Sequence, residues 1–122
     1  MPDMRLGVVE SRFADIVWAH APMTTRELTQ LCEKELNWKR TTTYTVLKKL
    51  CDRGIFHMEK MKVTVLITKQ EFSSMQSQQF VEENFHGSLP AFIAAFTAGR
   101  MPSAEEMEQI KIMIKQYEEE QA

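Results

Sequence analysis

The segment of residues 38–54, WKRTTTYTVLKKLCDRG, constrains the fold more than any other part of the chain. Four of its positions recur at the spacing that places side chains on one face of an α-helix: Thr43, Leu47, Leu50 and Cys51. Gly54 can take the left-handed conformation that commonly follows the last turn of a helix. The segment therefore predicts an amphipathic helix over residues 39–54 whose apolar face packs on a core.

Most side chains off this apolar face are cationic or carry a hydroxyl group. Cations attract DNA phosphates, and threonine can exchange hydrogen bonds with base edges or pack its methyl group against thymine. A helix that reads the major groove needs this pattern, although an ordinary solvated helix can show it too. The DNA-contacting residues that the pattern predicts are Lys39, Arg40, Thr41, Thr42, Tyr44, Thr45, Lys48 and Lys49.

Two further helices are expected before this segment. Residues 8–20 carry apolar side chains at helical spacing, and Pro22 cannot continue their helix. Thr24 and Glu27 then have the spacing of a capping box, which predicts the start of a second helix. Trp38 follows this second helix and is expected to fill the angle before the third. The three helices together predict a helix-turn-helix.

The hydrophobic period changes from 3.6 to 2 after the third helix, which predicts two short β-strands. The wing that they form, residues 55–67, has its turn at Lys60, Met61 and Lys62. Three helices followed by a basic-tipped hairpin are the order of a winged helix-turn-helix, in which the hairpin tip can touch flanking phosphate or minor groove. Lys60 and Lys62 therefore join the predicted DNA-contacting set.

The expected fold class is mainly α, with a winged helix-turn-helix in residues 1–69 followed by three helices in residues 70–122. No further globular segment covers the apolar faces of these last helices. Since oligomers most often close as two-fold dimers, we expect a homodimer, with a monomer whose helices fold back as the alternative. The predicted dimer interface comprises Phe72, Met75, Phe80, Val81, Phe85, Leu89, Phe92, Ile93, Phe96, Met107, Ile110, Ile114 and Tyr117.

The charge of the chain is unevenly distributed. The formal net charge is -2, but cations dominate residues 39–62 and carboxylates dominate from residue 103 onward. Such asymmetry indicates a basic binding end. No run approaches the roughly 18 apolar residues of a membrane-spanning helix, and the first residues do not resemble a signal peptide. We therefore expect a cytoplasmic protein without membrane insertion.

The residue types that carry catalysis or bind metals lack the necessary spacing. The three histidines are scattered, and Cys32 and Cys51 fall on apolar helix faces, where reduced core cysteines are the rule. The four glycines lie at expected helix boundaries, so no phosphate-cradling loop is indicated. No nucleophile can be paired with a base. The sequence predicts neither an enzyme, nor a cofactor, nor a metal site.

Two features together resemble the penicillinase-repressor family, the BlaI/MecI/CopY group of bacterial transcriptional repressors. One is the W-x-x-x-T-x-x-T-x-L-x-x-L-x-x-x-G spacing from Trp38 to Gly54, and the other is the segment FVEENFHGSLPAFIAAFT of residues 80–97. The resemblance spans essentially the whole chain. It implies a homodimer that covers a palindromic operator in double-stranded DNA, with the winged domain on DNA and the C-terminal helices pairing the subunits.

The same resemblance bears on how such a repressor is released. Penicillinase-type members are inactivated by cleavage in the dimerisation half, which implies a sensor protease as a further partner and Ala95–Phe96 as the corresponding bond. Copper-responsive members carry a C-terminal cysteine cluster, whereas this chain has no cysteine after Cys51. A winged-helix module that binds proteins and a regulator that responds to a ligand or metal remain as alternatives.

Overall fold

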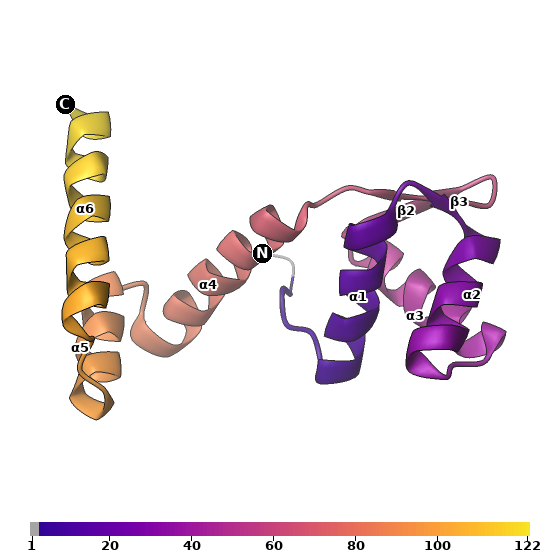
Figure 1. Ribbon diagram of the computed structural model, residues 1–122, viewed down its shortest axis with the longest axis horizontal. Coiled ribbons are helices and arrows are strands. Elements are labelled where there is room, and N and C mark those ends of the chain that lie inside the picture. The colour runs from indigo at the N-terminus through magenta and orange to yellow at the C-terminus, as the bar shows by residue number, and fades with distance from the viewer. Residues whose placement is uncertain (1–2) are drawn as a thin grey trace. The chain divides into compact units, whose positions relative to one another are not determined.

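The computed structural model describes residues 3–122, which form helices and one small sheet (Figure 1). The elements in order are α1 (Val8–His20), β1 (Met23–Thr24), α2 (Thr25–Leu36), α3 (Arg40–Asp52), β2 (Phe56–Glu59), β3 (Lys62–Val65), α4 (Lys69–Phe85), α5 (Leu89–Gly99) and α6 (Ala104–Gln121). The expected fold class, mainly α with a winged helix-turn-helix and C-terminal helices, is confirmed. None of these helices is long and apolar enough to cross a membrane.

Internal contacts divide the chain into two compact units, Met1–Gln79 and Phe80–Ala122. The division falls inside α4, ten residues beyond the boundary at 69/70 that we drew from the sequence. No composition change marks this position, because α4 is one continuous helix. The first unit therefore contains the winged helix-turn-helix together with the first part of α4.

The first unit is built around a core of aliphatic and aromatic side chains from α1, α2, α3 and the sheet. Phe13, Leu47 and Phe56 are each at most 1% exposed. Burying one such side chain contributes about 1.5–3 kcal/mol, more than a surface ion pair does. Trp38 stacks on Phe13 with ring centroids 5.7 Å apart, so it fills the angle between α2 and α3 as expected.

The sheet has three strands in the order β1-β3-β2, all antiparallel. The sequence predicted only β2 and β3, since the two residues of β1 are too few to show a period. Met23 pairs with Val63, which joins the start of α2 to the wing. The Nε1 of Trp18 donates to the carbonyl oxygen of Ile67 at 3.0 Å and ties α1 to the far end of the wing.

The turn of the wing is shorter than predicted. Lys60 and Met61 alone form it, with φ of 52° and 66°, and Lys62 is already in β3 opposite Glu59. Positive φ at both central residues matches the twist of the two-residue hairpin, which is why the strands close without a third turn residue. The predicted place of Lys62 in the turn was therefore wrong.

The end of α3 is a Schellman motif, as Gly54 predicted. Gly54 has φ of +79°, its N–H donates to the carbonyl of Cys51, and the N–H of Ile55 donates to the carbonyl of Leu50. These bonds satisfy carbonyls that the helix end would leave free and turn the chain directly into β2. The direction of the wing relative to α3 therefore depends on this glycine.

The N-terminal segment before α1 also belongs to this unit. Met4 is fully buried, its N–H donates to Oε1 of Gln79 at 2.7 Å, and its carbonyl accepts from Gln76 of α4. The guanidinium of Arg53 donates to the carbonyls of Asp3 and Arg5. The segment thus links the end of α3 to α4.

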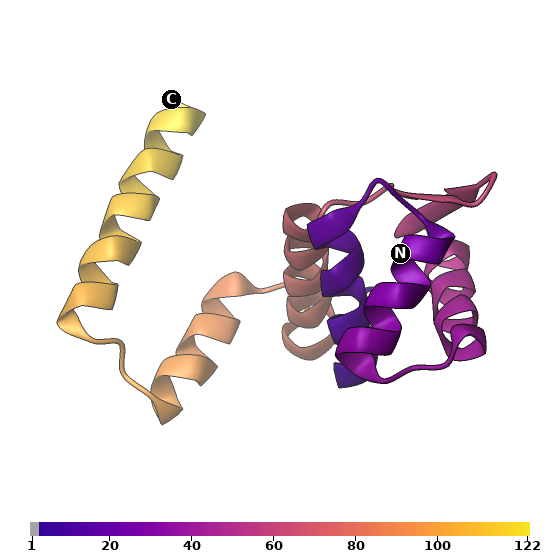
Figure 2. The same ribbon diagram turned by 45° about the vertical axis from the view of Figure 1, so that its right-hand side comes forward.

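The second unit holds an aromatic cluster and two helices without buried residues. Phe80, Phe85 and Phe92 meet at centroid distances of 5.5–6.1 Å. Ser88 and Ser103 cap α5 and α6, since each side-chain oxygen accepts a hydrogen bond from the backbone N–H three residues later. Figure 2 shows α5 and α6 as two helices joined by a short connection, and neither buries a residue.

Gly54→Ala should lower the free energy of unfolding of the first unit by about 1–2 kcal/mol, because an L side chain is strained at positive φ. Trp18 and Trp38 both lie in this unit, so urea unfolding followed by tryptophan fluorescence measures it. Gly99→Ala is the matched control, since Gly99 has ordinary φ and open space for a Cβ. Equal midpoints for the two variants would contradict the role given to Gly54.

Candidate nucleic-acid interface

The outward face of α3 presents Thr41, Thr45 and Lys48 in one line at i, i+4 and i+7, and all three are exposed. Burial of Leu47 and Leu50 on the opposite face holds this line outward. The hydroxyl of Thr45 donates to the carbonyl oxygen of Thr41 at 2.9 Å. Its oxygen can still accept a hydrogen bond, and its methyl group can meet a thymine methyl.

The two lysines at the centre of α3 differ in how firmly they are held. Lys48 pairs with Asp52 at 3.0 Å, but both side chains are more than half exposed, so the pair contributes little and can open. Lys49 pairs with Glu10 of α1 at 3.1 Å, and only 22% of the Glu10 side chain is exposed. Lys49, which the sequence assigned to DNA, thus ties α3 to α1.

Two hydrogen-bonding partners lower the pKa of Glu10. The larger effect is that of the Gly7 N–H, which donates to Oε1 at 3.1 Å, and the second is that of the Lys49 ammonium. This carboxylate therefore stabilises both the start of α1 and the contact between α1 and α3 while it is ionised.

Arg40 and Tyr44 lie on the side of α3 that faces α2. They line a hollow together with residues of α2 and Met61 at the tip of the wing. Thr42 is exposed, and Lys39 is the N-cap of α3 without a side-chain cap bond. The predicted helix residues are therefore exposed or half-buried around α3, with Arg40 and Tyr44 toward α2 and Lys49 toward α1.

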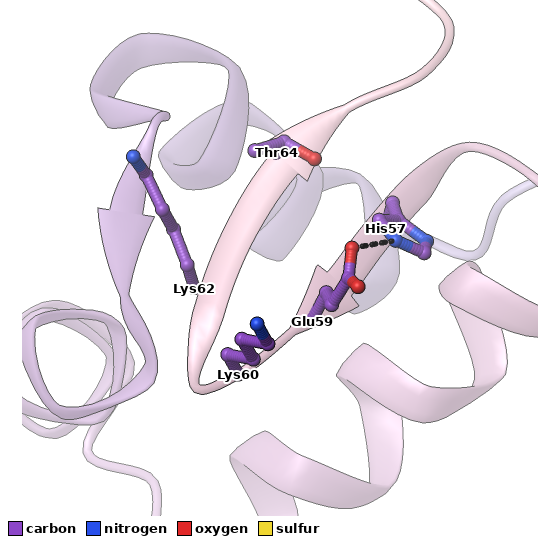
Figure 3. A pocket seen from close by; sticks show the side chains of 5 residues that line it. All are labelled: His57, Glu59, Lys60, Lys62 and Thr64. Carbon is purple, nitrogen blue, oxygen red and sulfur yellow. Dashed lines mark ion pairs between the residues drawn. The ribbon is translucent and has the colours of Figure 1, made fainter.

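The outer face of the wing carries His57, Glu59, Lys62 and Thr64, with Lys60 at the turn (Figure 3). Glu59 pairs with Nε2 of His57 at 3.5 Å, and Lys62 extends away from that pair in Figure 3. His57 and Thr64 were not in the predicted set. Their alternation with Glu59 and Lys62 across the strands could have placed them on this face.

The cations of the first unit divide into two groups. Arg5, Arg12, Lys48, Lys49, Arg53 and Lys69 each make an ion pair or hydrogen bond. Within residues 3–79, the cationic side chains with no such partner are those of Arg26, Lys34, Lys39, Arg40, Lys60 and Lys62. Every cation of the second group lies on α2, at the start of α3 or on the wing. These elements hold the positive charge that remains available to an external anion.

The predicted dimer-interface residues fall into both units. Phe72 is 4% exposed and packs on Trp18 in the core of the first unit, and Met75 packs against the same core. Those in the second unit are half-buried or exposed. The exposed ones are Phe80, Leu89, Ile93, Phe96, Met107, Ile110, Ile114 and Tyr117, and the half-buried ones are Val81, Phe85 and Phe92.

Three further large apolar residues of the second unit are exposed and were not in the predicted set: Met101, Ile112 and Met113. Met113 follows Ile110 by three residues, and this spacing could have identified it. The predicted Ala95–Phe96 bond lies inside α5, where Phe96 contacts Phe92 and the guanidinium of Arg100 lies 5.0 Å from its ring centroid.

Burial raises the pKa of the Cys32 and Cys51 thiols, and both cysteines are free. Among residues 3–122, no group of three or more His, Cys, Asp or Glu side chains is placed to hold a metal ion.

Glu10→Gln should destabilise the protein at neutral pH and progressively less in acid. The folded pKa of Glu10 is depressed, so its contribution is complete above the unfolded value near 4.5 and is lost as pH falls through the folded pKa. The measurement is the difference in unfolding free energy between wild type and variant, from urea titrations at pH 7, 5 and about 3. Asp52→Asn, which opens the exposed Lys48 pair, should show a smaller difference. A difference for Glu10→Gln that does not change with pH would contradict this account.

The family model described as penicillinase repressor matches residues 6–116. The chain is similar to the penicillinase repressor of Bacillus licheniformis, with 21% identity over 117 residues that cover 93% of this chain and 91% of that protein. The resemblance inferred from the sequence is thereby confirmed, and the chain belongs to the penicillinase repressor family.

Proposed function

We propose that the protein is a homodimeric transcriptional repressor that binds a palindromic operator through α3 and the wing. The line of exposed side chains on α3 carries this proposal, because Thr41 and Thr45 can meet base edges and Lys48 can meet a phosphate. Arg40, Tyr44 and Thr42 flank this line. Membership in a family of repressors supports the same function.

The wing supplies the second set of contacts in this proposal. Lys60 and Lys62 make no ion pair within residues 3–122, and the pairing of β1 with β3 fixes the wing to the start of α2. A lysine at the tip of a wing meets flanking phosphates or the adjacent minor groove. Lys39, at the N-cap of α3, adds positive charge at the other end of the same surface.

The second unit is proposed to pair two copies of the chain. Half or more of the side-chain surface of Ile93, Ile114 and Tyr117 is exposed, and no residue of α5 or α6 is buried. Apolar surface of this extent marks a protein interface. A two-fold pair would present two copies of α3 to the two halves of a palindrome.

Release of the operator is proposed to follow cleavage in this second unit by a sensor protease, as the family resemblance implies. The bond Ala95–Phe96 precedes all of α6 in the chain, so cleavage there would detach α6 and its share of the dimer interface. A DNA-binding repressor of this kind would act in the bacterial cytoplasm.

Lys48→Ala and Thr45→Ala should affect DNA binding in different ways. If each subunit neutralises roughly four phosphates, log affinity falls with log salt at a slope of about −7. Lys48→Ala should weaken all duplexes alike and flatten this slope by about one unit, whereas Thr45→Ala should reduce the preference for the selected palindrome. Fluorescence anisotropy with a palindrome selected from a random pool, and with a scrambled duplex, measures both.

Lys111→Ala is the control for net charge, because Lys111 lies on α6 of the second unit. Its slope should equal that of the wild type. Wild-type protein that shows neither salt dependence nor preference for any duplex would refute the repressor function and favour a protein-binding winged helix.

Ile114→Glu should dissociate the dimer, because a carboxylate buried at an apolar interface is left unpaired and costs several kcal/mol. Ile112→Glu is a closely matched control. Ile112 is 51% and Ile114 50% exposed, but the two residues point to opposite sides of α6. Sedimentation velocity should show a monomer only for Ile114→Glu. Dissociation by both variants or by neither would contradict the proposed interface.

A further inference from the structure

A hollow lies between α2, the start of α3 and the tip of the wing, and the DNA contacts predicted from the sequence include no residue of α2. We call it the α2–α3 hollow. It is lined by Thr25, Arg26, Gln30 and Glu33 of α2, by Arg40 and Tyr44 of α3, and by Met61 of the turn, among others. It adjoins the proposed DNA-contacting face, because Arg40 and Tyr44 belong to both.

Two arginines enter this hollow from different helices. Arg26 lies in the first turn of α2 and Arg40 in the first turn of α3, and neither guanidinium group makes an ion pair or hydrogen bond with any described residue. Four of the other arginines in the chain have carbonyl or carboxylate partners. Two unpaired guanidinium groups that line one hollow can bind an anion together, and the forked geometry of arginine fits phosphate.

A buried hydroxyl group at the same place also lacks a partner. Thr25 is 1% exposed, and its Oγ1 makes no hydrogen bond with any described residue. The N–H of Thr25 already donates to the carbonyl of Met61 at 2.9 Å, which holds the tip of the wing against the start of α2. On the side nearest the sheet, this hydrogen bond holds in place the backbone that bounds the hollow.

The charge of the hollow varies along its length. Arg26, Gln30 and Glu33 follow one another at i, i+4 and i+7 on one face of α2, so Glu33 lies roughly 10 Å from Arg26 along the helix axis. The part of the hollow beside the start of α2 is therefore positive, and the part beside Glu33 carries a negative charge. An anion would lie between the two guanidinium groups.

We infer that Arg26 and Arg40 together hold one phosphate of the DNA backbone in the α2–α3 hollow. The inference rests on the proposed function and adds a contact from α2, outside the recognition helix. A phosphate held between the two helices would fix the depth and direction of α3 in the major groove, because backbone contacts set the register of a protein on DNA. Arg26 itself would read no base.

Phosphate ethylation interference tests this inference, with a duplex that the wild-type protein selects from a random-sequence pool. In each half-site, ethylation of one phosphate should weaken wild-type binding roughly tenfold, as expected for loss of a charged hydrogen bond. Arg26→Ala and Arg40→Ala should each lose sensitivity at that same phosphate and keep it elsewhere. Lys34→Ala, which removes a cation from the same helix outside the hollow, should keep sensitivity there.

The outcomes separate the two proposals. If the wild-type protein selects no duplex, the repressor function fails. If it selects one, but Arg26→Ala retains every interference signal or loses one at a different phosphate from Arg40→Ala, the shared phosphate is wrong and the function stands. Tryptophan fluorescence verifies that each variant is folded, since Trp18 and Trp38 pack against the core.

Discussion

The candidate interface depends on the burial of one face of α3. Thr43, Leu47 and Leu50 are each at most 1% exposed, and their packing leaves the helix no freedom to rotate. Turning it would expose several apolar side chains, at about 1.5–3 kcal/mol for each. The cations and hydroxyl groups on the opposite face are therefore presented outward by the core, and the exposed Lys48–Asp52 pair contributes little to this orientation. The Schellman motif at Gly54 then fixes the direction of the wing relative to α3.

The cations of the first unit fall into two groups, those that hold elements of the fold together and those without a protein partner. Lys49, Arg53 and Lys69 hold elements together by contacts with Glu10, with backbone carbonyls and with Asp15. A cation held in this way is less available to a phosphate, because its partner must first be displaced. The unpaired cations lie instead on α2, at the start of α3 and on the wing. Net charge does not reveal this division, since the whole chain is formally acidic.

The two units differ in how their apolar residues are used. Those of the first unit meet one another in a closed core that extends to Phe72, whereas none of those in α5 and α6 is buried within a single chain. The aromatic contacts of Phe80, Phe85 and Phe92 are too few to cover the rest. Exposed apolar surface of this kind supports the proposed pairing of two copies of the chain.

The sequence by itself determined the helices, their caps and the class of fold, because capping boxes, Gly54 and hydrophobic period act over a few neighbouring residues. It could not determine β1, the burial of Met4 or the pairing of Lys49 with Glu10, since each joins segments far apart in the chain. Only the tertiary structure decided which cations remain free and which helices share a hollow. The physical reason is that the partners of a charged side chain depend on which residues lie near it in space. The local hydrophobic period of the sequence does not determine these neighbours.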